Sequence, residues 1–271
     1  MKLLEIFQKR KNIIIGAVHL PPLLSYRDFP GFDIALKNAV ADLKAFERGG
    51  VDGIIFENNY DVPHEIFVSA PVISSMTFLG EKLRNVTHLP MGVSVLWNDY
   101  RTALSIAKVL NLQFIRIPVF VDKVQTAYGI VEGARSDAID FREAIDAKNV
   151  ALFTDIHVKH AKLLSEHDLL TSAELAIENK SDAIIITGQW TGDAPSMLEL
   201  ENLRKKIVEF PILVGSGMDE HNAKELFQFA NGAIVSTSLK SGEKKQGEVN
   251  VKAYMQRIDE SKVKKLIGNL R

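Results

Sequence analysis

In the segment ALFTDIHVKH, residues 151–160, an acid, an imidazole and an ammonium group stand two positions apart, at Asp155, His157 and Lys159. The apolar residues around Asp155, His157 and Lys159 indicate a buried β-strand, in which alternate side chains share a face. Such a row supports proton transfer: the carboxylate fixes the imidazole tautomer, and the lysine stabilises an oxyanion or, when desolvated, forms a Schiff base. The alternative is a salt-bridge ladder inside the fold.

Polar side chains also end other apolar segments, namely His19, Glu57, Asn58 and Arg116. Oxygen and nitrogen ligands from neighbouring strands can converge on one divalent cation, so Glu57, His19 and Asp155 form a possible metal site. Alternatively, Glu57 is a hydrogen-bonded acid that pairs with Arg116 or Lys159. Because these groups come from scattered segments, the sequence assigns no metal ligand and leaves a divalent cation as a possibility.

Two further segments have the features of a phosphate-binding site. In LVGSGMDEHNAKEL, residues 213–226, an apolar run leads into Gly215, Ser216 and Gly217 and then into a helical pattern. Glycines let backbone N–H groups approach an anion, and the start of a helix adds positive potential. The segment VSTSLK, residues 235–240, adds the hydroxyl groups of Ser236, Thr237 and Ser238. The alternative for both segments is an ordinary turn.

A glycine-containing segment, TGQWTGDAP at residues 187–195, precedes these two. Thr187 and Gly188 can contact a ligand, and Trp190 can form an apolar wall over it. Alternatively, Trp190 packs on a neighbouring helix.

Elements that can bring these residues together follow from the hydrophobic pattern. Eight short apolar runs alternate with longer segments in which apolar residues recur three and four positions apart, as in helices that cover a sheet. The runs are residues 13–20, 53–58, 91–97, 114–119, 150–158, 183–188, 211–217 and 232–238. Eight strand–helix units predict a (β/α)8 TIM barrel formed by residues 1–271 as one domain, with a doubly wound sheet as the alternative.

The polar residues gather at the carboxyl ends of the predicted strands, where barrels carry their active sites. This asymmetry favours the catalytic interpretation of Asp155, His157 and Lys159 over the structural one. The long connection 118–136 is a candidate lid or partner contact, and the charged segment 241–248 is predicted to be a solvated loop.

Composition excludes other classes of function. The 271 residues include 33 Lys plus Arg and 34 Asp plus Glu, a balance that argues against nucleic acid or an anionic membrane as the main partner. There is no cysteine, which excludes thiolate chemistry. We read no signal peptide and no membrane-spanning run, and therefore expect a cytoplasmic protein. Barrels commonly associate, so a homo-oligomer is expected.

The motifs GAVHLPPL, ENNYDVP, DIHVKH, TGQWTG and PILVGSGM, in this order, resemble the BtpA family. The named member of that family is implicated in the biogenesis or stability of photosystem I. The resemblance implies a phosphate-binding TIM barrel akin to the ribulose-phosphate-binding group. It marks as pocket residues His19, Glu57, Asn58, Asp155, His157, Lys159, Gly188 and Gly215 to Gly217. Trp97 and Tyr128 stand where the family pattern differs, which points to a diverged specificity.

Together these patterns predict an enzyme that acts on a sugar phosphate or a related phosphorylated metabolite. Isomerase, epimerase and aldolase chemistry all fit an acid–base group beside a phosphate anchor. The alternative is a non-catalytic assembly factor built on an enzyme-like barrel, since one fold hosts many functions.

Overall fold

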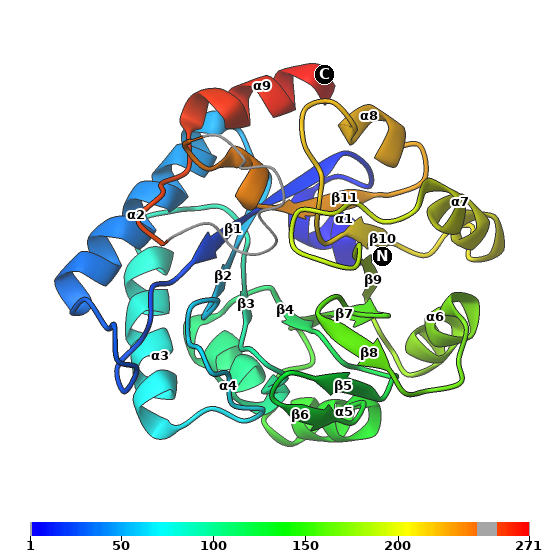
Figure 1. Ribbon diagram of the computed structural model, residues 1–271, viewed down its shortest axis with the longest axis horizontal. Coiled ribbons are helices and arrows are strands. Elements are labelled where there is room, and N and C mark those ends of the chain that lie inside the picture. Colours follow the sequence, from blue (N-terminus) through cyan, green and yellow to red (C-terminus); the bar gives the residue numbers. More distant parts are fainter. Residues whose placement is uncertain (1, 243–253, 271) are drawn as a thin grey trace.

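The computed structural model describes residues 2–242 and 254–270. Eight parallel strands close into a barrel whose order is also their order in the chain (Figure 1). They are β1 (Ile13–His19), β2 (Gly53–Glu57), β3 (Met91–Ser94), β4 (Phe114–Ile117), β7 (Ala151–Ile156), β9 (Ala183–Ile186), β10 (Ile212–Val214) and β11 (Gly232–Val235). The predicted (β/α)8 barrel is thus confirmed, and the doubly wound alternative is wrong.

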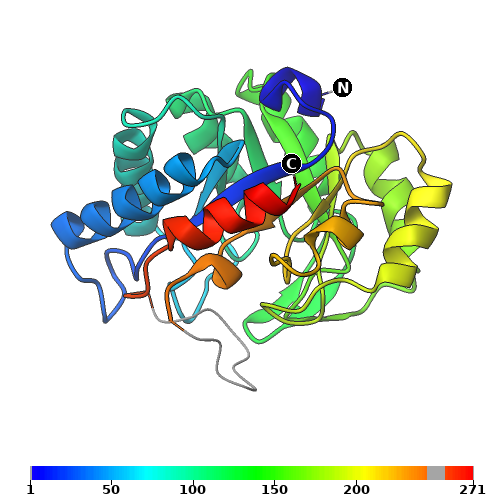
Figure 2. The same ribbon diagram turned by 90° about the horizontal axis from the view of Figure 1, so that it is seen from above.

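Helices surround the barrel because each presents an apolar face to the strands (Figure 1). They are α2 (Phe32–Gly49), α3 (Ala70–Arg84), α4 (Tyr100–Leu110), α5 (Arg135–Ala144), α6 (Leu169–Glu178), α7 (Met197–Lys206), α8 (Ala223–Leu226) and α9 (Glu260–Leu270). Helices α2 and α9 run side by side and close the ring (Figure 2). None of the helices in residues 2–242 and 254–270 is both long and apolar enough to cross a membrane.

A short helix that the hydrophobic pattern did not predict, α1 (Lys2–Phe7), closes the amino-terminal end of the barrel. Its Phe7 ring lies 5.8 Å from the ring of Phe114, which stacks on Phe153 at 4.6 Å. Leu3 is fully buried in the same cluster. These aromatic rings fill the interior below the level of the polar residues, so the charged groups lie toward the opposite, carboxyl-terminal end.

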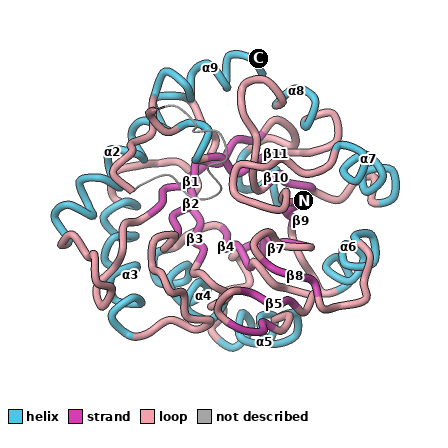
Figure 3. The backbone as a smooth tube through the Cα atoms, in the orientation of Figure 1, coloured by secondary structure: helices cyan, strands magenta, loops and turns pink. Residues whose placement is uncertain are grey.

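The long connection after β4 folds into a hairpin of β5 (Val124–Thr126) and β6 (Gly129–Val131). Strand β8 (Ala161–Leu163), from the connection after β7, pairs with β5 and completes an antiparallel three-stranded sheet outside the barrel (Figure 3). A lid or partner role for residues 118–136 stays a prediction. Of the predicted solvated loop 241–248, residues 243–248 lie outside the described residues.

Candidate functional site

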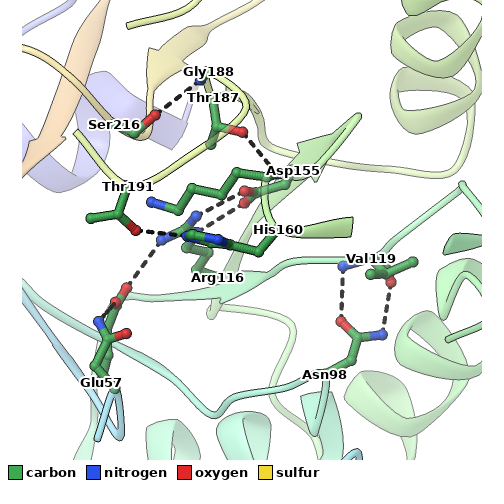
Figure 4. A network of polar contacts seen from close by, with 12 residues as sticks. Glu57, Asn98, Arg116, Val119, Asp155, His160, Thr187, Gly188, Thr191 and Ser216 are labelled. Carbon is green, nitrogen blue, oxygen red and sulfur yellow. Dashed lines mark hydrogen bonds and ion pairs between the residues drawn. The ribbon is translucent and has the colours of Figure 1, made fainter. Parts of the chain in front are cut away.

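A chain of buried ion pairs crosses the centre of the barrel at the carboxyl-terminal end of the strands (Figure 4). The Arg116 guanidinium donates from Nε and Nη2 to the two carboxylate oxygens of Asp155, at 2.9 and 2.8 Å. Its Nη1 donates to Oε1 of Glu57 at 3.2 Å. Burial alone would lower the pKa of Arg116, but the charges of Asp155 and Glu57 raise it well above its usual value. Arg116 is therefore a permanent cation shared by two carboxylates.

The position of Arg116 decides between the two interpretations of Glu57. Glu57 pairs with Arg116, as the hydrogen-bonded alternative proposed, and its Oε2 lies 3.9 Å from Nε2 of His19. Within residues 2–242 and 254–270, no three His, Cys, Asp or Glu side chains come together as a metal-binding group. The trio of His19, Glu57 and Asp155 is thus not arranged as a cation site, because the guanidinium lies between the carboxylates.

Lys159 follows β7 and points into the cavity above this ion-pair chain. Its backbone N–H donates at 3.0 Å to Oγ1 of Thr187, the residue that directly follows the neighbouring strand β9. Burial and the nearby charge of Arg116 lower the pKa of the Lys159 amine to about 8, against a smaller raising effect of Glu57 and Asp155. An appreciable fraction of this amine is neutral near pH 7, so it can act as a base or a nucleophile.

His19, the last residue of β1, is a neutral imidazole. Burial lowers its pKa well below the usual value, and the charges of Lys240, Lys159 and Arg116 lower it further. Its Nδ1 is buried and makes no hydrogen bond within the described part of the chain. This nitrogen is available to a ligand that enters the cavity, either as an acceptor or as a donor.

His157 does not join Asp155 and Lys159, and the proposed three-residue row is wrong. Strand β7 ends at Ile156, and His157 takes a left-handed backbone conformation with φ 47°. Its backbone N–H donates to Asp122 outside the barrel, at 3.0 Å, and its side chain is not part of the cavity wall. The alternation of a strand no longer holds past its last paired residue, so the side chain turns away.

Asp155 lies below the cavity surface. Its exposed fraction is 1%, and both of its carboxylate oxygens accept from Arg116. It orients the guanidinium rather than facing a ligand. Of the three residues Asp155, His157 and Lys159, only Lys159 lines the cavity.

A cavity of about 1180 Å³ opens at the carboxyl-terminal end of the barrel. Its floor is formed by the central charged and imidazole groups His19, Glu57, Arg116 and Lys159. Its rim includes both predicted phosphate segments, Gly215–Ser216–Gly217 and Ser236–Thr237–Ser238. The residues predicted to carry chemistry and those predicted to hold an anion therefore share one cavity.

The three serines of these segments differ in their hydrogen bonds. The Ser216 hydroxyl accepts from the N–H of Gly188 at 3.0 Å and donates to the carbonyl of Asp193 at 2.7 Å, so it holds the preceding loop (Figure 4). The Ser238 hydroxyl donates to the carbonyl of Met218 at 2.7 Å. The buried Ser236 hydroxyl has no partner among the described residues. Of the three serines, Ser236 is therefore the one whose hydroxyl is left without a partner in the described part of the chain.

Three other predicted residues support the cavity without forming its wall. The Asn58 side chain accepts from the N–H of Leu96 at 2.7 Å and is fully buried. Thr187 accepts from the backbone N–H of Lys159. A Cβ on Gly188 would lie 2.5 Å from the carbonyl oxygen of Asp193, so the close approach of this loop requires glycine. These residues hold their neighbours in place, and their predicted contact with a ligand stays a prediction.

His160 is a cavity residue that the sequence did not reveal. Its Nε2 lies 2.8 Å from Oγ1 of Thr191 (Figure 4). Its ring meets the Trp190 ring edge-on, with centroids 5.3 Å apart. Burial lowers its pKa to about 4, so the ring is neutral at pH 7. Strand alternation predicts that His160 points away, but its φ of 60° turns the side chain inward.

Gly217 is expected to tolerate no side chain. Its φ is 71°, and an added Cβ would lie 2.0 Å from the backbone nitrogen of Ala194. Gly31 is the matched control, because its φ is 88° and nothing lies within 4 Å of the place that a Cβ would take. A left-handed backbone alone costs about 1–2 kcal/mol for alanine. Chemical denaturation should show Gly217→Ala less stable than Gly31→Ala by about 1 kcal/mol or more; equal losses would contradict the steric role.

Comparison with known proteins places the chain among relatives over nearly its full length. The model of the BtpA family matches residues 10–270. The photosystem I biogenesis protein BtpA of Synechocystis sp. is 36% identical over 253 residues, which cover 92% of this chain and 86% of that protein. An uncharacterised mitochondrial protein of Caenorhabditis elegans is 31% identical, and the match covers 88% of both chains.

Solved structures share the fold at low identity. The (S)-3-O-geranylgeranylglyceryl phosphate synthase of Thermoplasma acidophilum, in complex with sn-glycerol-1-phosphate, superimposes with a TM-score of 0.59 and 12% identity, covering 98% of this chain and 96% of that chain. The N-(5'-phosphoribosyl)anthranilate isomerase of Pyrococcus furiosus gives a TM-score of 0.54 at 11% identity, covering 95% and 98%. These similarities concern the barrel alone. The match of residues 10–270 to the family model, together with the relatives above 30% identity, shows that the chain belongs to the BtpA family.

Proposed function

We propose that the protein is an enzyme that binds a small phosphorylated metabolite and carries out acid–base or Schiff-base chemistry, of the isomerase, epimerase or aldolase type. One observation carries this proposal. The Lys159 amine, whose pKa is lowered to about 8, faces the same cavity as the glycine and serine segments at 215–217 and 236–238. A reactive amine and an anion-binding rim are thus within reach of one ligand.

Several features support the binding of a phosphate group at the rim. Gly215 and Gly217 line the same cavity as Ser236, whose buried hydroxyl has no partner within the described chain. The turn of 3₁₀ helix η1 (Thr237–Leu239) follows Ser236, and the first N–H groups of a helical turn have no partner within it. The charges around His19 are also favourable, since Lys240 and Lys159 act on it as cations, whereas the charge of Arg116 is balanced by Asp155 and Glu57. Such a concentration of donors and positive charge favours a dianion.

Lys159 is the group that we assign to the reaction itself. Its neutral amine attacks a substrate carbonyl carbon, the carbonyl oxygen leaves as water with the two amine hydrogens, and one proton taken up from solvent gives the protonated Schiff base. This cation accepts the electron pair released when a proton or a carbon substituent leaves the adjacent carbon. His19 and Glu57 border the cavity beside Lys159 and are assigned to proton transfer. Hydrolysis by water then restores the amine and the carbonyl.

The proposal is tested with glycolaldehyde phosphate, a small phosphorylated aldehyde, and sodium borohydride. The amine and the aldehyde form an imine with loss of water, and borohydride delivers hydride to the imine carbon to give a stable secondary amine. Mass spectrometry should locate the adduct on Lys159 in the wild-type protein and show no adduct there in Lys159→Met. Lys162→Met is the matched control, because Lys162 is exposed on the nearby strand β8 and should leave labelling of Lys159 unchanged.

A separate control tests whether the phosphate group of the aldehyde contributes to the labelling of Lys159. Unphosphorylated glycolaldehyde should label Lys159 at least about tenfold more slowly, since it lacks the group that the rim binds. Inorganic phosphate should slow the labelling by glycolaldehyde phosphate. Equal labelling of Lys159 and of exposed lysines with both aldehydes would contradict the proposed function.

The assembly-factor alternative is favoured by one observation, the similarity to a relative named as a photosystem I biogenesis protein. On this alternative, the cavity need not bind a phosphorylated ligand. The two proposals differ in a thermal melting screen, because a ligand that binds the folded state raises the melting temperature. A rise with sugar phosphates that is lost in Ser236→Ala supports the enzyme; the absence of any rise supports the assembly factor.

A further inference from the structure

The wall of the cavity opposite the phosphate segments is aromatic and apolar. In the closed barrel, β4 and β3 lie diametrically across from β11 and β10. The loops after β2, β3 and β4 contribute His64, Trp97 and Tyr128 to the cavity, together with Val62, Leu96, Pro118 and Ala127. Tyr60, also from the loop after β2, lies on the β11 side instead, because its hydroxyl accepts from Lys240 at 2.9 Å. A ligand anchored by its phosphate at β10 and β11 therefore extends toward His64, Trp97 and Tyr128.

This wall is preorganised by the sheet outside the barrel. Trp97 is 7% exposed and belongs to a small apolar cluster with Val119, Val124 and Val158, to which the hairpin contributes. Tyr128, between β5 and β6, packs on the same cluster. The Tyr128 ring also meets the His64 ring edge-on, with centroids 5.3 Å apart. Rings held in place by such packing lose little freedom when a flat ligand contacts them.

The same wall carries no formal charge. None of the cavity residues that the loops after β2, β3 and β4 contribute within the described chain is Lys, Arg, Asp or Glu. Burial lowers the pKa of His64 to about 4, so this imidazole is neutral at pH 7. A charged group would be desolvated here without a partner, whereas a flat uncharged ring would bury apolar area.

We infer that the substrate is a phosphate monoester whose other end is a flat, uncharged aromatic ring, as in a phosphoribosylated heterocycle. This inference rests on the proposed function, because it assumes that a phosphate group occupies the 215–217 and 236–238 segments. The phosphate fixes the position of the ligand along the cavity. The carbon chain or sugar then passes over Lys159, and the ring contacts Trp97 and Tyr128. The aromatic wall thus selects among phosphorylated compounds.

The chain has two tryptophans, Trp97 and Trp190, and both face the cavity. The variant Trp190→Phe leaves Trp97 as the single reporter of the aromatic wall. Adenosine 5'-monophosphate serves as the probe with both groups, ribose 5-phosphate as the probe without the ring, and adenosine as the probe without the phosphate. We expect adenosine 5'-monophosphate to quench Trp97 fluorescence, after correction against free tryptophan, and ribose 5-phosphate to bind with little quenching.

Calorimetry gives the corresponding affinities. Contact with an aromatic ring is expected to make adenosine 5'-monophosphate bind about tenfold or more tightly than ribose 5-phosphate. Tyr128→Ala and the conservative Trp97→Phe should reduce this ratio and leave the affinity for ribose 5-phosphate within about twofold. The exposed Ile130→Ala, on the same hairpin, is the matched control and should leave both affinities unchanged.

The outcomes separate this inference from the proposed function. Equal affinities for the two phosphates, with no change in Trp97 fluorescence, would overturn the aromatic assignment and leave the phosphate site intact. If adenosine bound as tightly as adenosine 5'-monophosphate, the proposed placement of the phosphate at the 215–217 and 236–238 segments would be overturned. A failure of all three probes to bind would count against both.

Discussion

Replacement of Arg116 by methionine is expected to lower the free energy of unfolding by about 3–5 kcal/mol, because it leaves two buried carboxylates without their cation. Arg116 is 6% exposed, and Glu57 and Asp155 are 3% and 1% exposed. Methionine fills a similar volume, so the loss reports charge rather than a cavity. Urea denaturation, with fluorescence as the signal, measures the change in the midpoint.

Two further variants identify the cause of that loss. Arg48→Met removes an exposed ion pair with Glu260, and surface pairs contribute about 0–1 kcal/mol. In the double variant Arg116→Met/Asp155→Asn, one uncompensated carboxylate is neutralised, so part of the lost stability should return. If Arg116→Met were no less stable than Arg48→Met, the buried ion-pair chain would not contribute to the stability of this barrel.

Lys159 should react with a trace acylating reagent much faster than any ordinary lysine near neutral pH. Its amine has a pKa of about 8. At pH 7 its neutral fraction is therefore about two hundred times that of a lysine with a pKa near 10.4. The labelling rate, measured by mass spectrometry, should rise about tenfold per pH unit below pH 8 and level off above it. For a lysine with a pKa near 10.4, the labelling rate would instead continue to rise past pH 9.

The charges around the amine can be varied as well. Glu57 raises the pKa of Lys159, so Glu57→Gln should move the inflection of the labelling curve below that of the wild type. Because burial disfavours the charged amine, Lys159→Met is expected to be more stable than the wild type at pH 7. This gain should shrink as the pH rises from about 8 toward about 10, where the unfolded chain also loses the proton. An inflection of the wild-type curve near pH 10 would contradict this assignment.

The architecture could be predicted from the sequence because its signals are local and repeated. Eight apolar runs that alternate with amphipathic segments leave few arrangements besides a barrel. The cavity residues His19, Glu57 and Lys159 were predicted from their place at the strand ends. The glycine and serine segments were predicted because a strand followed by Gly-Ser-Gly and a helix is itself a local pattern.

The features of the fold and the site that could not be predicted depend on backbone geometry outside the barrel strands. The chain enters the left-handed region at both His157 and His160, which reverses the expected directions of the two imidazoles. The six-residue helix α1 and the three-residue strands β5, β6 and β8 are too short to show a periodicity. Contacts such as that of the Ser216 hydroxyl with Gly188 and Asp193 join segments about 25 residues apart, which no local pattern reveals.

The closure of the barrel by Leu3 and Phe7 has a kinetic consequence. With that end filled by packed rings, compounds enter and leave through the opening above Lys159. A compound seated on the central ion pairs is then trapped beneath any second compound that binds above it. If the reaction uses two substrates, they should therefore bind in a fixed sequence, the deeper one first, and the deeper product should depart last.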